Sequence, residues 1–108
     1  MILYFSGTGN SAYIAKRIAK ETGDPVFSIN DSIRQGKVFS DRNQIRLIFV
    51  LPTYAWRIPR VVERWILAST FSENAQAYFV MNCGDAIGNA AKYTKRLCRK
   101  KGFRYMGC

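Results

Sequence analysis

The sequence predicts an α/β protein with a doubly wound parallel sheet, in which strands form a central layer and helices cover its faces. Two observations predict this class. Short apolar runs alternate with longer segments of helical apolar period, in the order β-α-β-loop-β-α-β-α-β. The strand-to-helix connections carry glycine and aromatic residues, whereas the reverse connections are plain. At 108 residues, the chain has room for a single domain, 1–108.

The first predicted strand is Ile2–Phe5, an apolar run that stops where Ser-Gly-Thr-Gly forms a turn. A helix is predicted from Asn10, because the apolar residues there begin to fall on one helical face. The residues on that face are Ala12, Ala15, Ile18, Ala19 and Thr22. Gly23 ends the helix, and Pro25 prevents it from continuing.

Two more strands are predicted in the middle of the chain. Val26–Ile29 is a short second strand. The segment Asn30–Asn43 is polar and irregular, with at most one helical turn near Ser32–Gln35. Ile45–Leu51 is the strongest strand, and its nearly continuous apolar run is typical of a central strand covered on both faces.

The second half repeats the helix–strand alternation. Pro59 suits the first turn of a helix. Its predicted core face carries Val61, Val62, Trp65 and Ile66. A buried strand follows at Ala77–Met81. The last helix is expected to turn inward Ile87, Ala90, Ala91, Thr94, Leu97 and Cys98. Gly102 ends this helix, and Phe103–Met106 begins a fifth strand.

The charge of the chain is strongly basic and unevenly spread. It has 17 lysines and arginines against 7 acidic residues, a net charge of +10. No carboxylate side chain follows Asp85, whereas the end of the chain carries Lys92, Lys95, Arg96, Arg99, Lys100, Lys101 and Arg104. Such a helix face fits an acidic partner protein, a nucleic acid or a plain solvated surface.

The residue inventory excludes several kinds of chemistry. The chain has no histidine, which excludes serine–histidine and cysteine–histidine catalysis. Its three cysteines, Cys83, Cys98 and Cys108, form no CxxC pair, so we predict no metal site within the chain. No apolar run reaches the roughly 18 to 20 residues of a membrane span, and no basic leader precedes the first strand. We therefore expect a reduced, cytoplasmic protein without membrane association.

A glycine loop joins the first predicted strand to the first helix. It reads Ser6-Gly7-Thr8-Gly9-Asn10-Ser11, with neutral side-chain donors and no lysine or arginine. Glycines let a backbone approach a ligand, and the start of a helix offers free N–H groups to a phosphate. A P-loop requires lysine where Asn10 stands, which argues against ATP or GTP.

A dinucleotide site is the alternative interpretation of this loop. Gly7–Ala12 satisfies GxGxxA, and Asp31 lies near the distance expected of a ribose-binding carboxylate. In the strand order 2-1-3-4-5, however, the third strand adjoins the first, and the loop Thr53-Tyr54-Ala55-Trp56-Arg57 becomes a wall suited to a planar ring. The loop Asn82–Ala86 would form the opposite wall, with Cys83 as a small filler and Asp85 also suited to cap a helix.

The segment Tyr-Phe-Ser-Gly-Thr-Gly-Asn-Ser resembles the phosphate loop of flavodoxins, which bind flavin mononucleotide (FMN). Together with Pro52–Trp56 and Cys83–Gly84, residues 4–17 resemble the flavodoxin half of flavodoxin–ferredoxin fusion proteins. The resemblance implies a 2-1-3-4-5 sheet, bound FMN and electron transfer, with no catalytic residue. It assigns the phosphate to Ser6, Thr8, Gly9, Asn10 and Ser11. It assigns the flavin ring to Pro52, Thr53, Tyr54, Ala55 and Trp56 on one side, and to Cys83, Gly84 and Asp85 on the other.

The chain also departs from that family. It stops in or just after the fifth predicted strand, so the final helix of the fold and the cysteine-rich half of the fusions are missing. Typical flavodoxins are acidic, whereas this chain is basic. We therefore expect a domain truncated at its C-terminus, with uncovered sheet surface that self-associates or pairs with another segment.

The expected role is electron transfer with a redox partner, either an acidic or an iron–sulfur protein. Two alternatives stay open at this point. One is an NAD(P)H-dependent quinone or flavin reductase on the same fold. The other, less favoured, is a non-redox nucleic-acid-binding module that uses the basic last helix.

Overall fold

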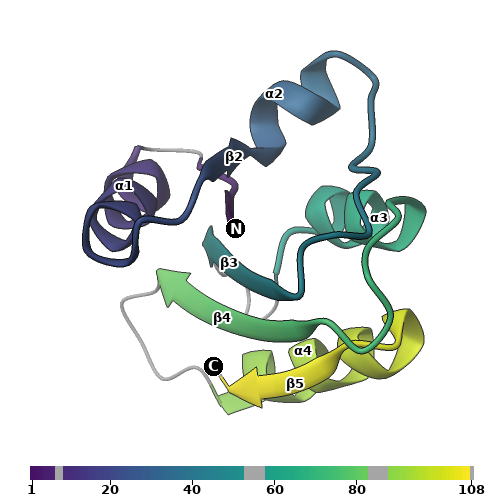
Figure 1. Cartoon of the computed structure of the whole chain (residues 1–108). Coiled ribbons are helices and arrows are strands. Elements are labelled where there is room, and N and C mark those ends of the chain that lie inside the picture. Colours follow the sequence, from purple (N-terminus) through teal and green to yellow (C-terminus); the bar gives the residue numbers. More distant parts are fainter. Residues whose placement is uncertain (7–8, 53–57, 83–87, 108) are drawn as a thin grey trace.

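The computed structural model describes residues 1–6, 9–52, 58–82 and 88–107, which form a five-stranded parallel sheet with helices on both faces (Figure 1). The elements are β1 (Ile2–Tyr4), α1 (Asn10–Thr22), β2 (Val26–Ser28), α2 (Ile29–Arg34), β3 (Arg46–Pro52), α3 (Arg60–Ala68), β4 (Gln76–Asn82), α4 (Gly88–Lys101) and β5 (Arg104–Gly107). The strand order is β2-β1-β3-β4-β5 and every neighbouring pair is parallel. The predicted doubly wound sheet of order 2-1-3-4-5 is confirmed.

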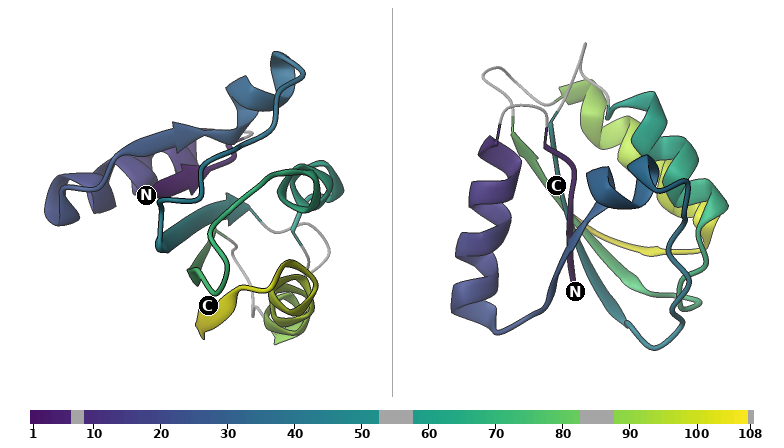
Figure 2. Two further views of the ribbon diagram at one scale, coloured as in Figure 1. Left: turned by 45° about the vertical axis from the view of Figure 1, so that its right-hand side comes forward. Right: turned by 90° about the horizontal axis from the view of Figure 1, so that it is seen from above.

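One face of the sheet is covered by α2, α3 and α4, as Figure 2 shows. We call it the closed face. Six strand residues on this face are almost fully buried: Leu3, Leu47, Phe49, Leu51 and Ala77 are 0% exposed and Phe79 is 2% exposed. Aromatic rings fill much of this core, with Phe49 stacked on Phe79 at 5.3 Å between ring centroids. Apolar burial against three helices therefore holds this side of the fold together.

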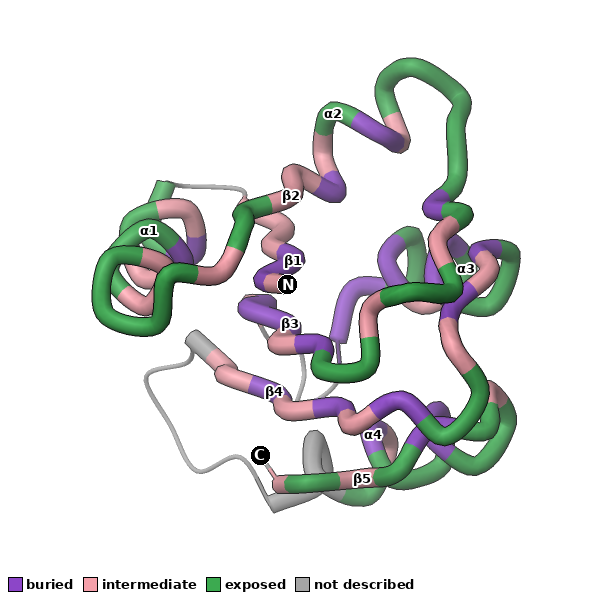
Figure 3. The backbone as a smooth tube through the Cα atoms, viewed as in Figure 1, coloured by how far each residue is buried: buried purple, intermediate pink, exposed green. Residues whose placement is uncertain are grey.

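The opposite face is covered by α1, which packs on β1, β2 and β3 (Figure 2). We call it the α1 face. Ile2 and Val50 are fully buried beneath Ala15 of α1. Ile48, Tyr78 and Val80 are half-buried, and Figure 3 shows buried and half-buried residues alternating along β4. Among the described residues, no helix other than α1 covers this face.

The sequence predicts an irregular segment after the second strand, with at most one helical turn near Ser32–Gln35, whereas the structure has a helix there. A six-residue helix, α2, begins at Ile29, where the second strand was predicted to end. Ser28 caps it, because the Ser28 Oγ accepts a hydrogen bond from the N–H of Asp31 at 3.2 Å. Ile29 is completely buried in the closed-face core, so tertiary packing stabilises a helix that the polar composition of the segment conceals.

Several predicted core residues and boundaries also need correction. Val61 of α3 is 42% exposed, because Val62, Trp65 and Ile66 occupy the inward face of the helix. Thr22 is exposed, and its hydroxyl donates to the backbone oxygen of Ile18 at 3.0 Å. The strand limits that differ from their predictions shift by one residue, and Ile87 lies outside the described residues.

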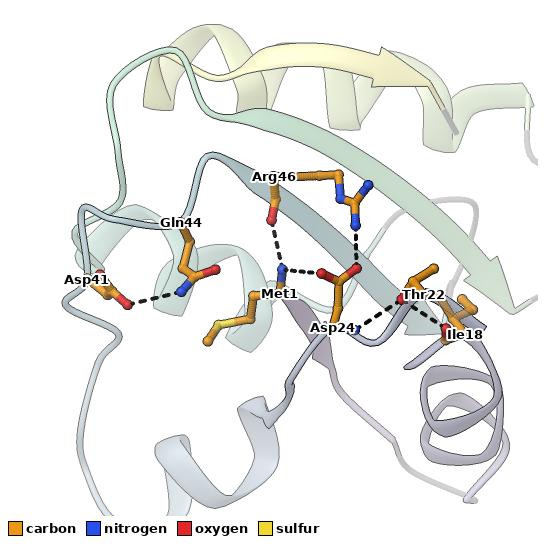
Figure 4. A network of polar contacts seen from close by, with 7 residues as sticks. All are labelled: Met1, Ile18, Thr22, Asp24, Asp41, Gln44 and Arg46. Atoms are coloured by element: carbon orange, nitrogen blue, oxygen red, sulfur yellow. Dashed lines mark hydrogen bonds and ion pairs between the residues drawn. The ribbon is translucent and has the colours of Figure 1, made fainter. Parts of the chain in front are cut away.

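A small polar network joins the strands at their amino ends (Figure 4). The Asp24 carboxylate lies 2.6 Å from Arg46 and 3.9 Å from the amino group of Met1. Burial opposes ionisation of Asp24, but hydrogen bonds from Thr22 and Arg46 and the nearby positive charges outweigh it and lower its pKa. The network links the beginnings of β1, β2 and β3, at the edge opposite the predicted ligand site.

Candidate functional site

The carboxyl ends of β1, β3 and β4 lie side by side at one edge of the sheet. Tyr4 is in register with Val50, and Pro52 is in register with Asn82. The three loops predicted to bind a ligand start from these strand ends. In open α/β sheets, ligands bind beyond the carboxyl ends where the strand order reverses, and here that point lies between β1 and β3.

Ser6 and Gly9, two described residues of the glycine loop, contact each other just before α1. The N–H of Gly9 donates to the Ser6 Oγ at 2.8 Å. Gly9 has a φ of +94°, a left-handed conformation that side chains other than glycine rarely adopt. The first helical bond follows at once, from the Tyr13 N–H to the oxygen of Gly9 at 3.0 Å.

The start of α1 is suited to an anion. Its N-cap residue, Gly9, has no side chain that could accept from the first N–H groups, and the first turn carries no acidic residue. The positive end of the helix dipole and these N–H groups are therefore left for a negatively charged ligand. Asn10 is exposed at this end, whereas Ser11 is only 2% exposed. Thr8 lies outside the described residues.

Asn30, the second residue of α2, holds the loop in place. The N–H of Ser6 donates to the Asn30 Oδ1 at 2.8 Å, and the Asn30 Nδ2 donates to the backbone oxygen of Ser6 at 2.9 Å. The backbone N–H and the backbone oxygen of Ser6 are thus both satisfied by the Asn30 side chain, which belongs to the neighbouring strand–helix unit. The sequence pattern did not single out this residue, although an amide side chain directly after the predicted strand Val26–Ile29 is a usable signal.

The strand before the loop is equally well anchored. The N–H of Phe5 donates to the oxygen of Val50 at 3.1 Å, so pairing with β3 continues to the residue just before Ser6. The loop therefore leaves the sheet from a fixed point, between the Asn30 contact on one side and β3 on the other. Such fixed backbone geometry is what close approach to a ligand requires.

The walls predicted for a planar ring are described only in part. Pro52 is half-buried at the end of β3, beside Asn82 of β4. The remaining ring residues lie outside the described part of the chain and stay predictions: Thr53, Tyr54, Ala55, Trp56, Cys83, Gly84 and Asp85. Ile58 is 2% exposed, so the chain returns to the closed-face core immediately before α3.

The dinucleotide alternative fails on topology. The observed order places β3 directly beside β1, whereas the dinucleotide-binding order puts the third strand beyond the second. Asp31, the residue expected to bind a ribose, lies within α2 and pairs with Arg34 on the surface at 3.3 Å. Its surroundings are those of an exposed helix residue.

One free cysteine lies among the described residues, away from this edge of the sheet. Cys98 is 1% exposed, and burial raises the pKa of its thiol to about 11, so it stays protonated and unreactive at neutral pH. Within the described ranges, no three histidine, cysteine or acidic residues gather as a metal site would require. Also within those ranges, no helix is long and apolar enough to cross a membrane.

Comparison with known proteins adds a likeness of fold. No protein-family model and no curated protein sequence matches the chain. A crystal structure of a protein from Bacteroides uniformis, provisionally named a flavoprotein, matches with a TM-score of 0.79 and 17% identity over 99% of this chain and 86% of that chain. A second provisional flavoprotein, from Bacteroides eggerthii, matches with a TM-score of 0.61 and 15% identity over 98% of this chain and 84% of that chain. The chain therefore has the flavodoxin-like α/β fold of these proteins.

Proposed function

We propose that this chain binds FMN at the carboxyl edge of its sheet and carries electrons in the manner of a flavodoxin. The observation that carries the proposal is that Ser6, held by Asn30, accepts a hydrogen bond from Gly9 at the N-terminus of α1, where no side chain caps the helix. The strand order puts the end of β1, from which this loop leaves, beside β3. The shared fold of two provisional flavoproteins supports the same conclusion.

The donors of the loop fit a phosphate monoester. Backbone N–H groups at a helix start and neutral hydroxyl and amide side chains are a common phosphate-binding set. Ser6, Thr8, Gly9, Asn10 and Ser11 would hold the phosphate. The net charge of +10 also favours a dianionic ligand over a neutral one.

The ring would lie between the segment 52–56 and the segment 83–85, which begin at the paired ends of β3 and β4. Bound FMN would supply one- and two-electron chemistry. The protein's own residues bind the phosphate, orient the ring and limit its contact with water. This division of work requires no catalytic side chain, which agrees with a chain that has no histidine.

Titration of the apoprotein with FMN and with riboflavin tests the proposal. Riboflavin lacks the phosphate, so it leaves the loop donors unpaired at about 1 to 3 kcal/mol each. We expect FMN to bind at least about tenfold more tightly, measured by quenching of flavin fluorescence. Equal affinities for the two ligands would contradict the phosphate site.

A pair of glycine variants sharpens this test. Gly9 and Gly36 both have positive φ values, +94° and +68°, and a Cβ atom would meet nothing within 4 Å at either position. Gly9→Ala and Gly36→Ala therefore carry a similar backbone penalty, of about 1 to 2 kcal/mol. Only Gly9→Ala should weaken FMN binding, because Gly36 lies after α2 and outside the loop. An unchanged affinity in Gly9→Ala would count against the site.

Addition of NADPH then separates a carrier from a reductase. We expect FMN-loaded protein to keep its yellow colour with NADPH alone and to lose it only when a separate reductase is added. Direct bleaching by NADPH would favour the reductase alternative on the same fold.

A further inference from the structure

The outer surface of the α3–α4 layer is strongly positive. Helix α4 presents exposed cations at positions spaced three and four residues apart, which places them on one helical stripe. The exposed cations of the two helices are Arg60, Arg64, Lys92, Lys95, Arg96, Arg99 and Lys100. We call this set the basic layer. From Lys92 to Lys100 the stripe is about 12 Å long, at 1.5 Å per residue.

Lys101, the last residue of α4, lies on the inward side of the helix and not on this stripe. The Lys101 side chain is half-buried, and its Nζ donates to the backbone oxygens of Leu67 and Ser69 at the end of α3. Burial also lowers the pKa of this amino group. Lys101 therefore stabilises the contact between α3 and α4, while the stripe faces solvent.

Carboxylates are sparse around the basic layer. Glu63 of α3 is half-buried and already has an interaction partner. Glu73 is exposed and lines a shallow pocket with Arg99 and Lys100, near the C-terminal end of α4. Helix α4 itself, Gly88–Lys101, carries no acidic residue in its sequence.

The α1 face provides a contrast. Helix α1 exposes Lys16, Arg17 and Lys20, with Glu21 beside them. At the amino ends of the strands, Arg46 is neutralised by Asp24. The excess positive charge is thus concentrated on the side of the molecule that carries α3 and α4.

The basic layer begins next to the candidate site. Helix α3 follows the segment 53–57 and α4 follows the segment 83–87, the two segments expected to flank the flavin ring. The phosphate loop instead leads into α1, on the other face. A protein bound to the basic layer would therefore lie on the ring side of the site.

We propose that the basic layer is the docking surface for an acidic electron-transfer protein, an inference that rests on the proposed function. Complementary charge speeds the encounter of two proteins and fixes their orientation. A nucleic acid is less favoured. Binding of a single strand uses exposed aromatic rings for stacking, and Tyr93 of α4 is half-buried with Arg96 at 5.9 Å over its ring.

Two triple variants with the same charge change test the proposal. Lys92→Glu/Arg96→Glu/Arg99→Glu reverses the stripe on α4, and Lys16→Glu/Arg17→Glu/Lys20→Glu reverses α1. Each variant changes the net charge by −6, from +10 to +4. Each also removes one arginine–tyrosine contact of 5.9 Å, so the two variants lose the same kind of ring contact.

The probe is an acidic plant-type [2Fe–2S] ferredoxin, titrated into FMN-saturated protein by calorimetry. We expect the affinity of the parent to fall about tenfold between 50 and 200 mM salt. At 50 mM salt, the α4 variant should lose about thirtyfold in affinity and the α1 variant less than about threefold. These results would support the basic layer as the docking surface.

Three results would overturn the proposal. They are no binding of ferredoxin by the parent, equal losses in the two variants, or tighter binding of a 20-base-pair DNA duplex that the α4 variant abolishes. The proposed function fails separately, if the parent does not bind FMN. A parent that binds FMN but shows any of the three results defeats the docking inference alone.

Discussion

The two faces of the sheet are built from the same strands but reach different degrees of burial. Phe79 and Tyr78 are adjacent in β4, yet Phe79 is 2% exposed on the closed face while Tyr78 is half-buried on the α1 face. Along β3, Phe49 is fully buried and its neighbour Ile48 is half-buried. The strand composition is apolar on both faces, so the covering helices account for the difference.

The two faces contribute unequally to the hydrophobic core. Three helices and a cluster of stacked aromatic rings make the closed face the main source of stability. The α1 face has a smaller core of Ile2, Ala15 and Val50, and its helix begins at Asn10, directly after the glycine loop. The main core therefore lies on one side of the sheet, and the loop proposed to bind phosphate leads into the helix on the other side.

Adjacent aromatic deletions give the largest expected contrast. Phe79→Ala should lower the free energy of unfolding by about 3 to 5 kcal/mol, because it opens a cavity beside Phe49 and Tyr105. Tyr78→Ala should cost about 1 to 2 kcal/mol, since its side chain already contacts solvent. Urea denaturation measures both values. Equal costs would show that the two faces contribute alike.

A second pair of variants tests how α2 of the closed face supports the loop that leads into α1. Asn30→Ala removes both hydrogen bonds to Ser6 and should cost about 1 to 3 kcal/mol. Ser28→Ala removes the cap of the same helix and should cost about 1 kcal/mol. Asn30→Ala should also weaken FMN binding, measured by fluorescence titration, whereas Ser28→Ala should not. Parallel losses of affinity would mean that α2 acts only through overall stability.

The same deletion at two positions of the α1 face measures the cover that α1 provides. Val50 is fully buried beneath α1, whereas Val80 is half-buried. Val50→Ala should cost about 1.5 to 2.5 kcal/mol and Val80→Ala about 1 kcal/mol or less, given about 0.8 kcal/mol per buried methylene. Thermal unfolding of both variants checks the difference. A larger loss at Val80 would indicate that another surface covers β4 in solution.

The smallest expected effect concerns the polar network at the amino ends of the strands, where Asp24 pairs with Arg46. The pKa of Asp24 is lowered in the folded state, so its contribution to stability is present above the ordinary pKa of 3.8 and is lost as pH falls through the lowered value. Asp24→Asn should cost up to about 1 kcal/mol at pH 7, because the pair with Arg46 is partly exposed. Once the pH lies below the lowered pKa of Asp24, the difference between parent and variant should vanish. A difference that persists there would assign the effect to packing.

The order of the elements and the glycine loop Ser6–Ser11 were predictable because they depend on local patterns. Helical periodicity predicted α1, Gly23 predicted its end, and Gly9 predicted the loop before it. Helix α2 was not predicted, because its stability comes from Ile29 in a core formed by distant segments. Asn30 was missed for the same reason, since its partner Ser6 lies 24 residues away in the sequence.

The sequence by itself determined the α/β class, and its resemblance to flavodoxins predicted the strand order 2-1-3-4-5 that the structure has. The edge of the sheet assigned to a ligand stays a prediction. It also determined the charge, which no folding can change. The tertiary structure alone decided which apolar strand residues are sealed from water, because burial depends on the helices that a face receives. It also decided what Lys101, on the same side of α4 as Leu97 and Cys98, meets there, namely the backbone oxygens of Leu67 and Ser69. Periodicity gives a residue its side of a helix or strand, and only the assembled layers determine what that side meets.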